Sequence, residues 1–329
     1  MNILYHILYP QGLGDDRFTY EGYKEAFEDF GHNVFPLTEK MDLARTIQSL
    51  KPDVFIEEGG FLFHDLEAKA DVLRKFRQRG GQVVLHGAMS QELLASIVRD
   101  SIIDVYFSEI DPTGDFGNFP PRLFKKMHWL AASQRIHGQA RPMSKYRCDI
   151  IYIGANLLKK REAFDTLLLP LIKNYHVKIY GFDWDFFDRR ILHPLAKIER
   201  LISGTGLLSK LRLMRQVPVN LEGSAYASAK ISINFHEKQP GNDFRTINAR
   251  TFKIPASGGF EVCDYVPQIR EFFGEDELVM PRNNKQWFEK IDYYLKNDNE
   301  REKIRARGTK RALREHTFYA RVKEILTCL

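Results

Sequence analysis

The sequence predicts an α/β protein with two doubly wound domains, each a parallel sheet with helices on its faces. Short apolar strands alternate with amphipathic helices in the first half, and the alternation restarts after a polar linker at 139–147. The chain has 329 residues, which fits two domains of about 150 residues each. Because 43% of the residues are hydrophobic, each half can bury its own core.

The first half alternates apolar runs with helical patterns. One amphipathic pattern ends on Gly31, a residue type that commonly stops a helix. We expect strands at 3–9, 32–37, 53–59, 83–89 and 103–109, and helices at 18–31, 41–50, 65–79 and 90–99. A loop-rich stretch at 111–124 follows before the linker.

The second half repeats the pattern, with strands at 148–156 and 177–184 around a helix at 157–172. The alternation breaks at 186–218, and the sheet resumes at 220–235. A short helix at 245–256 then ends on Ser257, Gly258 and Gly259 before a strand at 260–265, which indicates a βαβ crossover. Ligands bind at the carboxyl ends of strands in open α/β sheets. Four polar residues fall there, namely Asn242, Arg245, Asn248 and Arg250.

Several short motifs follow one another in this part of the chain. They are an Asn-x-Arg-x-Phe helix at 248–252, a Gly-Gly turn at 258–259 and a Phe-x-x-x-Asp-Tyr strand at 260–265. A Phe followed by Glu-Leu-Val at 273–279, a helix ending in Tyr-Tyr-Leu at 293–295 and a closing segment at 311–321 complete the series. In order and spacing, residues 225–325 resemble the CgeB-type glycosyltransferases of the GT-B fold.

The resemblance implies two Rossmann-like domains that face each other across a cleft. An N-terminal acceptor domain is expected at 1–143 and a C-terminal nucleotide-sugar domain at 144–315, with the final helix, 316–329, packing back on the first domain. The implied function is transfer of a hexosyl or pentosyl group from a nucleotide-sugar to a glycan, a lipid-linked glycan, a protein or modified DNA. The alternative is a non-catalytic GT-B-like protein that binds a nucleotide-sugar or serves in assembly.

The sequence departs from the family pattern at Lys253, where the family usually has an acidic residue. In related enzymes that acid helps to hold the ribose of the donor, and an ammonium group accepts no hydrogen bonds. Three interpretations follow: the acid comes from elsewhere in the chain, the donor carries extra negative charge, or transfer has been lost. We expect the first, because the rest of the motif is intact.

A second group of candidate donor-binding residues lies in the turn that leads from the strand at 148–156 into the next helix. The amide groups of such turns attract phosphate. The turn contains Gly154 and Asn156, and basic residues follow at Lys159, Lys160 and Arg161. The alternative is an ordinary turn with a solvated basic face.

The helix expected at 245–256 supplies the remaining donor candidates. Arg245 and Asn248 are three residues apart, so they would share a helix face and could meet one ligand. Arg250 lies on another face, where it either contacts the donor or pairs with a carboxylate such as Asp264. Gly258 and Gly259 permit a positive φ and close approach of the backbone, which serves either a ligand or a helix cap.

Candidate catalytic residues follow strands of the first half. Glu57, Glu58 and His86 each come after an apolar run, at the edge where an acceptor would bind. A carboxylate or an imidazole there could take the proton of the acceptor, and the resemblance implies that a His also holds the transferred sugar. Asp15 and Asp16 are further candidate bases. Their alternative role is to cap the helix that follows.

Two motifs that would bind other cofactors are incomplete. Gly12 and Gly14 begin a dinucleotide fingerprint, but Arg17 stands where its third glycine belongs, which counts against a nicotinamide-dependent enzyme. Asp183 and Asp185 form an Asp-x-Asp pair of the kind that holds a divalent cation in a one-domain glycosyltransferase fold. Because this chain has two domains, we expect no metal and no cofactor beyond the nucleotide-sugar.

The net charge of +6 is concentrated in the second half. Residues 1–145 contain 17 basic and 20 acidic residues, and residues 146–329 contain 32 and 23. A basic half suits a pyrophosphate-bearing donor, an anionic lipid or a nucleic acid. The insertion at 186–218 has seven Lys and Arg against two acids, with apolar residues at helical spacing. Three interpretations of this insertion remain open: a packed helical insertion, a membrane-edge patch and a nucleic-acid-facing patch.

The sequence also bears on the cellular compartment. The N-terminus lacks the basic region and long apolar run of a signal peptide, and the most apolar helical stretch, 163–172, is too short to span a bilayer. Cys148, Cys263 and Cys328 are scattered and lack the spacing of zinc ligands. These features predict a cytoplasmic protein, peripheral to a membrane if the insertion binds one.

Overall fold

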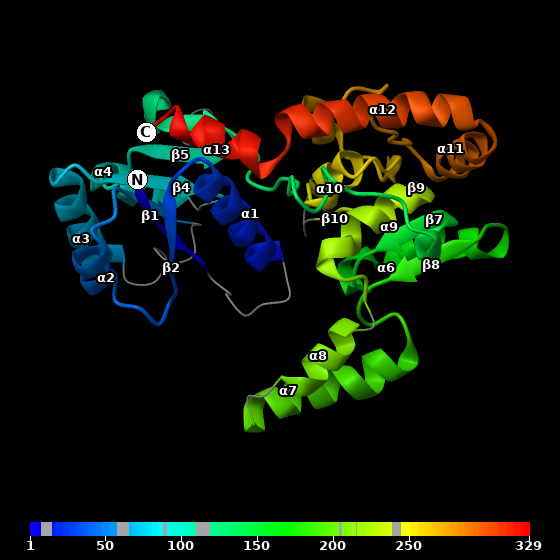
Figure 1. The fold of residues 1–329 in the computed structure, drawn as a ribbon, viewed down its shortest axis with the longest axis horizontal. Coiled ribbons are helices and arrows are strands. Elements are labelled where there is room, and N and C mark those ends of the chain that lie inside the picture. The colour runs from blue at the N-terminus through cyan, green and yellow to red at the C-terminus, as the bar shows by residue number, and fades with distance from the viewer. Residues whose placement is uncertain are drawn as a thin grey trace. The chain divides into compact units, whose positions relative to one another are not determined.

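The computed structural model of the chain describes residues 1–7, 15–57, 66–87, 91–109, 119–203, 206–214, 216–238 and 245–329 (Figure 1). Backbone contacts divide the chain into two compact units. Unit 1 comprises Met1–Ala131 and Phe318–Leu329, and unit 2 comprises Ala132–Thr317. Each unit is built on a parallel sheet, as the alternation of strands and helices predicted.

The sheet of unit 1 has six parallel strands in the order β2-β1-β3-β4-β5-β6. Most of the strand residues are buried, whichever face of the sheet they are on, and this explains the near-continuous apolar runs of the sequence. The chain moves outward in one direction from β1 to β2 and in the other from β3 onward, so β1 and β3 flank a topological switch point. The strands are β1 Asn2–His6, β2 Asn33–Leu37, β3 Val54–Glu57, β4 Gln82–His86, β5 Val105–Ser108 and β6 Phe124–Lys126.

Helices cover both faces of this sheet and form two cores. Successive strand residues point to opposite faces, so Tyr5 packs in one core and Leu4 in the other. The last helix of the chain packs beside α1, where a Cβ at Gly22 would lie 2.2 Å from the ring of Phe318. The helices are α1 Asp15–Asp29, α2 Leu43–Leu50, α3 Leu66–Gln78, α4 Gln91–Arg99 and α13 Phe318–Leu326, with a 3-10 turn at Pro121–Leu123.

The main sheet of unit 2 has four parallel strands in the order β12-β9-β7-β8, with its switch point between β7 and β9. The strands are β7 Cys148–Ile153, β8 Val177–Tyr180, β9 Ala229–Asn234 and β12 Glu261–Cys263. A separate antiparallel pair is formed by β10 Glu237–Lys238 and β11 Arg245–Thr246.

The helices of unit 2 differ in length and regularity. The α-helices are α6 Arg161–Ala163, α7 His193–Ile202, α8 Leu207–Met214, α9 Glu222–Ser228, α10 Arg250–Ala256, α11 Asn284–Lys296 and α12 Asp298–Glu315. Shorter 3-10 and π-helical segments lie at Ser144–Tyr146, Leu158–Lys160, Phe164–Leu168, Leu169–Lys173, Asp188–Leu192, Val219–Leu221 and Pro267–Glu271.

The structure corrects three details of the sequence interpretation. The first part of the stretch 220–235, expected to resume the sheet, forms helix α9, and β9 begins only at Ala229. The helix expected at 245–256 begins only at Arg250, because Arg245 and Thr246 pair with Lys238 and Glu237. Arg245 and Asn248 therefore do not share a helix face. Strand β6 lies partly inside the stretch expected to be a loop, because a three-residue strand with two lysines carries no apolar signal.

Contacts also group residues 132–143 with unit 2. Ala132 forms a β-bridge with Thr317, the last residue of unit 2 before the chain returns to unit 1. The backbone N–H of Met143 donates to Ser228 Oγ at 2.8 Å. The roles expected for the domains at 1–143 and 144–315 remain predictions.

Candidate functional site

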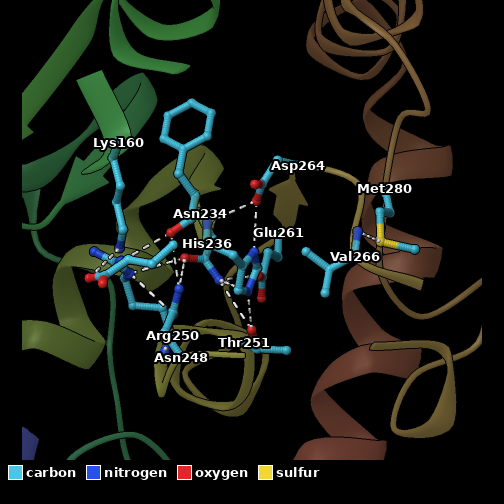
Figure 2. A network of polar contacts seen from close by, with 12 residues as sticks. Lys160, Asn234, His236, Asn248, Arg250, Thr251, Glu261, Asp264, Val266 and Met280 are labelled. Carbon is cyan, nitrogen blue, oxygen red and sulfur yellow. Dashed lines mark hydrogen bonds and ion pairs between the residues drawn. The ribbon is translucent and has the colours of Figure 1, made fainter. Parts of the chain in front are cut away.

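The carboxyl edge of the unit 2 sheet carries a hydrogen-bonded cluster at the switch point between β7 and β9 (Figure 2). Its members come from the end of β9, the segment before α10, α10 itself and the region of β12. We call it the Arg250 network, and its residues are Asn234, His236, Asn248, Arg250, Thr251, Glu261 and Asp264. Open α/β sheets bind ligands at such switch points.

Arg250 joins the ends of the two strands that flank this switch point. Its Nη1 donates to the carbonyl oxygen of Ile153 at 2.8 Å, and its Nη2 donates to that of Phe235 at 3.3 Å. Gly154 makes room for the guanidinium, because a Cβ at this position would lie 2.1 Å from Nη1. The glycine is therefore required by the packing of Arg250, whatever ligand also approaches it.

Two asparagines orient the arginine. Asn234 Oδ1 accepts from Arg250 Nε and from Asn248 Nδ2, each at 3.0 Å. Asn248 Oδ1 accepts from the backbone N–H of Arg250 at 3.0 Å. These bonds fix the start of α10 against the end of β9, so the guanidinium is held in one orientation.

A histidine and two acids complete the network around Arg250. Asp264 Oδ1 accepts from the backbone N–H of His236 and lies 2.7 Å from Nδ1, so Nδ1 donates and Nε2 accepts from Thr251 at 2.9 Å. Burial lowers the pKa of His236, although Asp264 opposes this effect. Burial raises the pKa of Glu261 to about 8 despite its hydrogen bond from Asn234. At neutral pH Glu261 is therefore mostly protonated.

Lys253 belongs to a second buried cluster, also in unit 2. Its Nζ lies 3.4 Å from Glu222 Oε2, and the two side chains are only 7% and 15% exposed. Tyr226 donates to Glu222 Oε1 at 3.1 Å, and His137 Nε2 lies 3.5 Å from Oε2. Burial alone would raise the pKa of Glu222, but Lys253 and His137 hold it well below its usual range. Sequence reasoning did not identify Glu222, His137 or Tyr226.

The other predicted donor residues of unit 2 have separate environments. The half-buried side chain of Asn156 makes no hydrogen bond to any residue that the structure describes, and its backbone N–H donates to Phe182 at 2.8 Å. Lys160 is buried with its Nζ 3.8 Å from Glu237 Oε1, and Lys159 reaches the other oxygen of that carboxylate. Arg245 lies in β11, and its side chain is outside the described part of the structure.

The two glycines after α10 have backbone roles. Gly258 has a φ of 72°, in the left-handed region, and its N–H donates to Pro255 at 2.9 Å. A Cβ at Gly259 would lie 2.9 Å from the carbonyl oxygen of Ile254, so this position also needs glycine. Contact of either glycine with a donor remains a prediction.

The carboxyl edge of the unit 1 sheet brings together two of the predicted catalytic residues and one that was missed. Glu57 ends β3, His86 ends β4 and His6 ends β1, and all three are buried. His6 Nδ1 lies 3.2 Å from Glu57 Oε2, across the switch point of this sheet. The ring of His86 stacks on Trp129 with 3.3 Å between ring centroids, and burial holds its pKa well below its usual range.

Further predicted residues of unit 1 are partly outside the described structure. Asp15 and Asp16 begin α1, but nothing is described of their side chains. Glu58, Gly12 and Gly14 lie outside the described residues. A second acid–imidazole pair stands at the same sheet edge, where His128 Nε2 lies 3.1 Å from Glu109 Oε1. Neither His128 nor Glu109 was among the predicted site residues.

Acidification is expected to destabilise the protein through His6. Burial, with Lys69 as a smaller cause, lowers the pKa of His6 from 6.5 to about 4. Between these values the unfolded chain binds a proton that the folded chain does not, so stability is lost as the pH falls from about 6.5 toward 4. The loss from His6 is about 2 kcal/mol between roughly pH 7.5 and 5. Urea unfolding should show that the free energy of unfolding differs less between the two pH values for His6→Asn than for the wild type. An equal difference for the two proteins would contradict the role assigned to His6.

The Asp-x-Asp pair is engaged by protein groups. Asp183 Oδ1 accepts from Arg212 Nη2 at 2.8 Å and lies 2.9 Å from His193 Nδ1. Asp185 Oδ1 accepts from the backbone N–H of Asp188 at 2.8 Å. Among the residues described, no group of three or more His, Cys, Asp and Glu side chains is placed to hold a metal ion.

Within the same residues, none of the helices has the length and apolar character needed to cross a bilayer.

Comparison with known proteins identifies the fold and the family. An α-glucosyltransferase in complex with UDP and a 13-mer DNA containing a HMU base is similar over 100% of this chain and 99% of its own, with a TM-score of 0.65 and 13% identity. Anabaena Alr3699/HepE in complex with UDP and glucose matches over 100% of both chains, with a TM-score of 0.60 and 11% identity. A glycosyltransferase from Rickettsia africae matches over 99% and 97%, with a TM-score of 0.62 and 10% identity.

These similarities confirm the predicted GT-B fold class. A search of curated proteins finds no match. A family profile described as glycosyl transferase-like matches residues 161–327, just over half of the chain, and this segment includes the whole Arg250 network. The chain belongs to this glycosyl transferase-like family.

Proposed function

We propose that this chain is a hexosyl- or pentosyltransferase of the CgeB type, which moves a sugar from a nucleotide-sugar to an acceptor without a metal ion. The observation that carries the proposal is the position of Arg250, whose guanidinium joins the two strand ends at the switch point of unit 2. This position lies inside the segment that matches the family. The solved structures of HepE with UDP and glucose support a nucleotide-sugar donor.

The donor would bind at the edge of the unit 2 sheet. Arg250 supplies a fixed positive charge, and the half-buried amide of Asn156 is available to a ligand. Negative charge develops on the leaving diphosphate during transfer, and preorganised donors and cations stabilise it. Because hydrogen bonds already hold the guanidinium of Arg250 in place, this group needs little reorganisation when the bond breaks. The nucleotide-sugar acts as co-substrate, and no other cofactor is proposed.

Glu222 would replace the acid that the family has at the position of Lys253. It is a carboxylate kept charged by Lys253. Burial raises the pKa of its neighbour Tyr226 well above the usual value, and Arg250 is near enough to oppose part of this shift. A carboxylate suits ribose hydroxyls because each of its oxygens accepts hydrogen bonds. In this proposal Lys253 positions the acid rather than contacting the ribose.

The acceptor would be activated in unit 1. Glu57 and His86 are the proposed bases, and His6 orients Glu57 from the neighbouring strand. Burial keeps both imidazoles neutral near neutral pH. We also propose a reducing compartment, the cytoplasm, because the three cysteines are free thiols.

A donor panel tests the proposal. The full chain is incubated with nucleotide-sugars, and both thermal stabilisation and release of the nucleoside diphosphate are measured with and without a chelator. We expect one donor to raise the melting temperature and to be slowly hydrolysed equally in both conditions. Replacing Asn156 by Ala should lower the affinity for that nucleotide-sugar about three- to tenfold, as expected for one lost hydrogen bond. The exposed Asn220, replaced by Ala, is the matched control.

Two outcomes would contradict parts of the proposal. Binding without any turnover, even with candidate acceptors, would favour the alternative of a non-catalytic nucleotide-sugar-binding protein, which the lysine at position 253 would then explain. Turnover that stops in chelator and returns with manganese would contradict the metal-independent reaction.

A further inference from the structure

Residues 186–203 and 206–214 form a π-helical turn followed by two helices that lie side by side, α7 and α8 (Figure 1). We call this segment the α7–α8 hairpin. Within it, only Asp188, Leu192 and Ala196 are buried among the residues whose side chains are described. The hairpin is therefore mostly surface, which is unusual for a segment so rich in leucine and isoleucine.

The acidic residues of the hairpin are used inside it. Asp188 Oδ1 accepts from Arg212 Nε at 2.7 Å, and the carboxylate is almost fully buried. Glu199 caps the second helix, because its two oxygens accept from the backbone N–H groups of Leu207 and Leu208 at 2.6 and 2.8 Å. Neither acid is left to offset the basic residues on the outer surface.

Four basic side chains of the hairpin are at least partly exposed. Arg189, Arg190, Lys197 and Lys210 form no ion pair with the part of the chain that the structure describes. Since both acids are engaged internally, the exposed charge of the described hairpin is positive. Such a surface attracts anions over distances up to about a Debye length.

Large apolar side chains are exposed between these charges. Leu201, Ile202 and Met214 are 86%, 81% and 83% exposed, and Phe186 is 75% exposed. Fully burying one such side chain is worth about 1.5–3 kcal/mol, so leaving them in water is costly. Others exposed on the same hairpin are Phe187, Ile191, Leu195, Ile198, Leu207, Leu211 and Leu213.

We propose that the α7–α8 hairpin docks on the surface of an anionic lipid bilayer. Apolar side chains of such helices enter the boundary between headgroups and acyl chains, while lysines and arginines remain at the level of the anionic headgroups. The hairpin offers both features on one short segment, without a residual acidic charge. This inference does not depend on the proposed sugar transfer.

Other partners satisfy only part of this surface. A nucleic acid would pair with the basic side chains but would leave Leu201 and Ile202 in water, since aliphatic residues provide no stacking surface. A second copy of the chain could cover the apolar residues but would bring two positive surfaces together. Of these three partners, the anionic lipid surface accounts for the apolar and the basic residues together.

Vesicle co-sedimentation of the full chain tests the proposal. We expect binding to mixed phosphatidylcholine–phosphatidylglycerol vesicles, little binding to phosphatidylcholine alone, and weaker binding at high salt. Replacing Arg189, Arg190 and Lys197 together by Gln should weaken binding roughly a hundredfold, at about fivefold for each charge. Replacing Leu201 and Ile202 by Gln should weaken it by at least about tenfold. All five residues are at least partly exposed, so the variants should fold.

The control is the pair Ile172→Gln and Lys173→Gln, an exposed apolar and an exposed basic residue elsewhere in unit 2. It should bind vesicles like the wild type. Absence of vesicle binding by the wild type at low salt would overturn the proposal. So would binding of a DNA duplex in preference to vesicles, with the loss confined to the charge variant, because that result would identify a nucleic-acid surface.

Discussion

Replacing Lys253 by Glu is expected to lower the free energy of unfolding by at least about 4 kcal/mol, enough to unfold a marginally stable domain. The variant places a second carboxylate beside Glu222, whose Oε2 lies 3.4 Å from the lysine Nζ in the wild type. Both side chains are largely buried, so water screens the repulsion poorly. Even loss of the lysine alone leaves a buried charge without its partner, which typically costs about 3–5 kcal/mol.

A double-mutant cycle separates this pair from general disruption. Lys253→Met and Glu222→Gln should each destabilise the protein in urea unfolding, and the double variant should lose much less than their sum. Because the pKa of Glu222 is lowered from 4.5, the stabilisation is present above about pH 4.5 and is lost as the pH falls further. If Lys253→Glu instead folds normally and binds a nucleotide-sugar more tightly, Lys253 faces the donor and the buried pair is wrong.

Replacing Arg250 by Ala is expected to have the second largest effect and to lower the free energy of unfolding by about 3–5 kcal/mol. The change leaves the carbonyl oxygens of Ile153 and Phe235 without this donor, and each unsatisfied buried polar group costs about 1–3 kcal/mol. Arg250→Lys should recover little, because an ammonium group cannot reach several acceptors in the planar arrangement of a guanidinium. Donor binding should be lost in both variants, since the positive charge is removed or displaced.

Urea unfolding and donor titration of the same proteins measure this. Gly154→Ala provides an independent disturbance, because its Cβ would displace the guanidinium without removing it, at a cost of about 1–3 kcal/mol. The exposed Arg147, replaced by Ala, should leave the unfolding midpoint unchanged. An Arg250→Ala protein as stable as Arg147→Ala would refute the structural role assigned to the network.

The sequence predicted the fold more completely than it predicted which groups the polar side chains contact. Apolar runs such as those of β3 and β4 indicated a parallel sheet because both faces of each strand are buried. Arg250 was correctly expected near a strand end, but its bonds to two main-chain carbonyls depend on how β7 and β9 lie side by side. His6 was missed for the same reason, since its contact with Glu57 requires the strand order β1-β3.

The Glu222 cluster shows a further limit. Residues 220–235 were interpreted as the resumption of the sheet, whereas the first part forms α9, a helix built largely of small residues. The partner of Lys253 lies on that helix, 31 positions earlier in the chain, and no local pattern connects the two. Sequence reasoning singled out Lys253 as a departure from the family pattern, but only the structure provides an acid beside it.

The most direct test of a donor site in unit 2 is hydrogen–deuterium exchange with and without a nucleotide-sugar identified from the panel. We predict slower exchange in peptides that cover residues 153–160, 234–238 and 248–258, where the switch point, Asn156 and the start of α10 lie. Protection confined to residues 2–20, around β1 and the start of α1, with no change in those unit 2 peptides, would contradict the account.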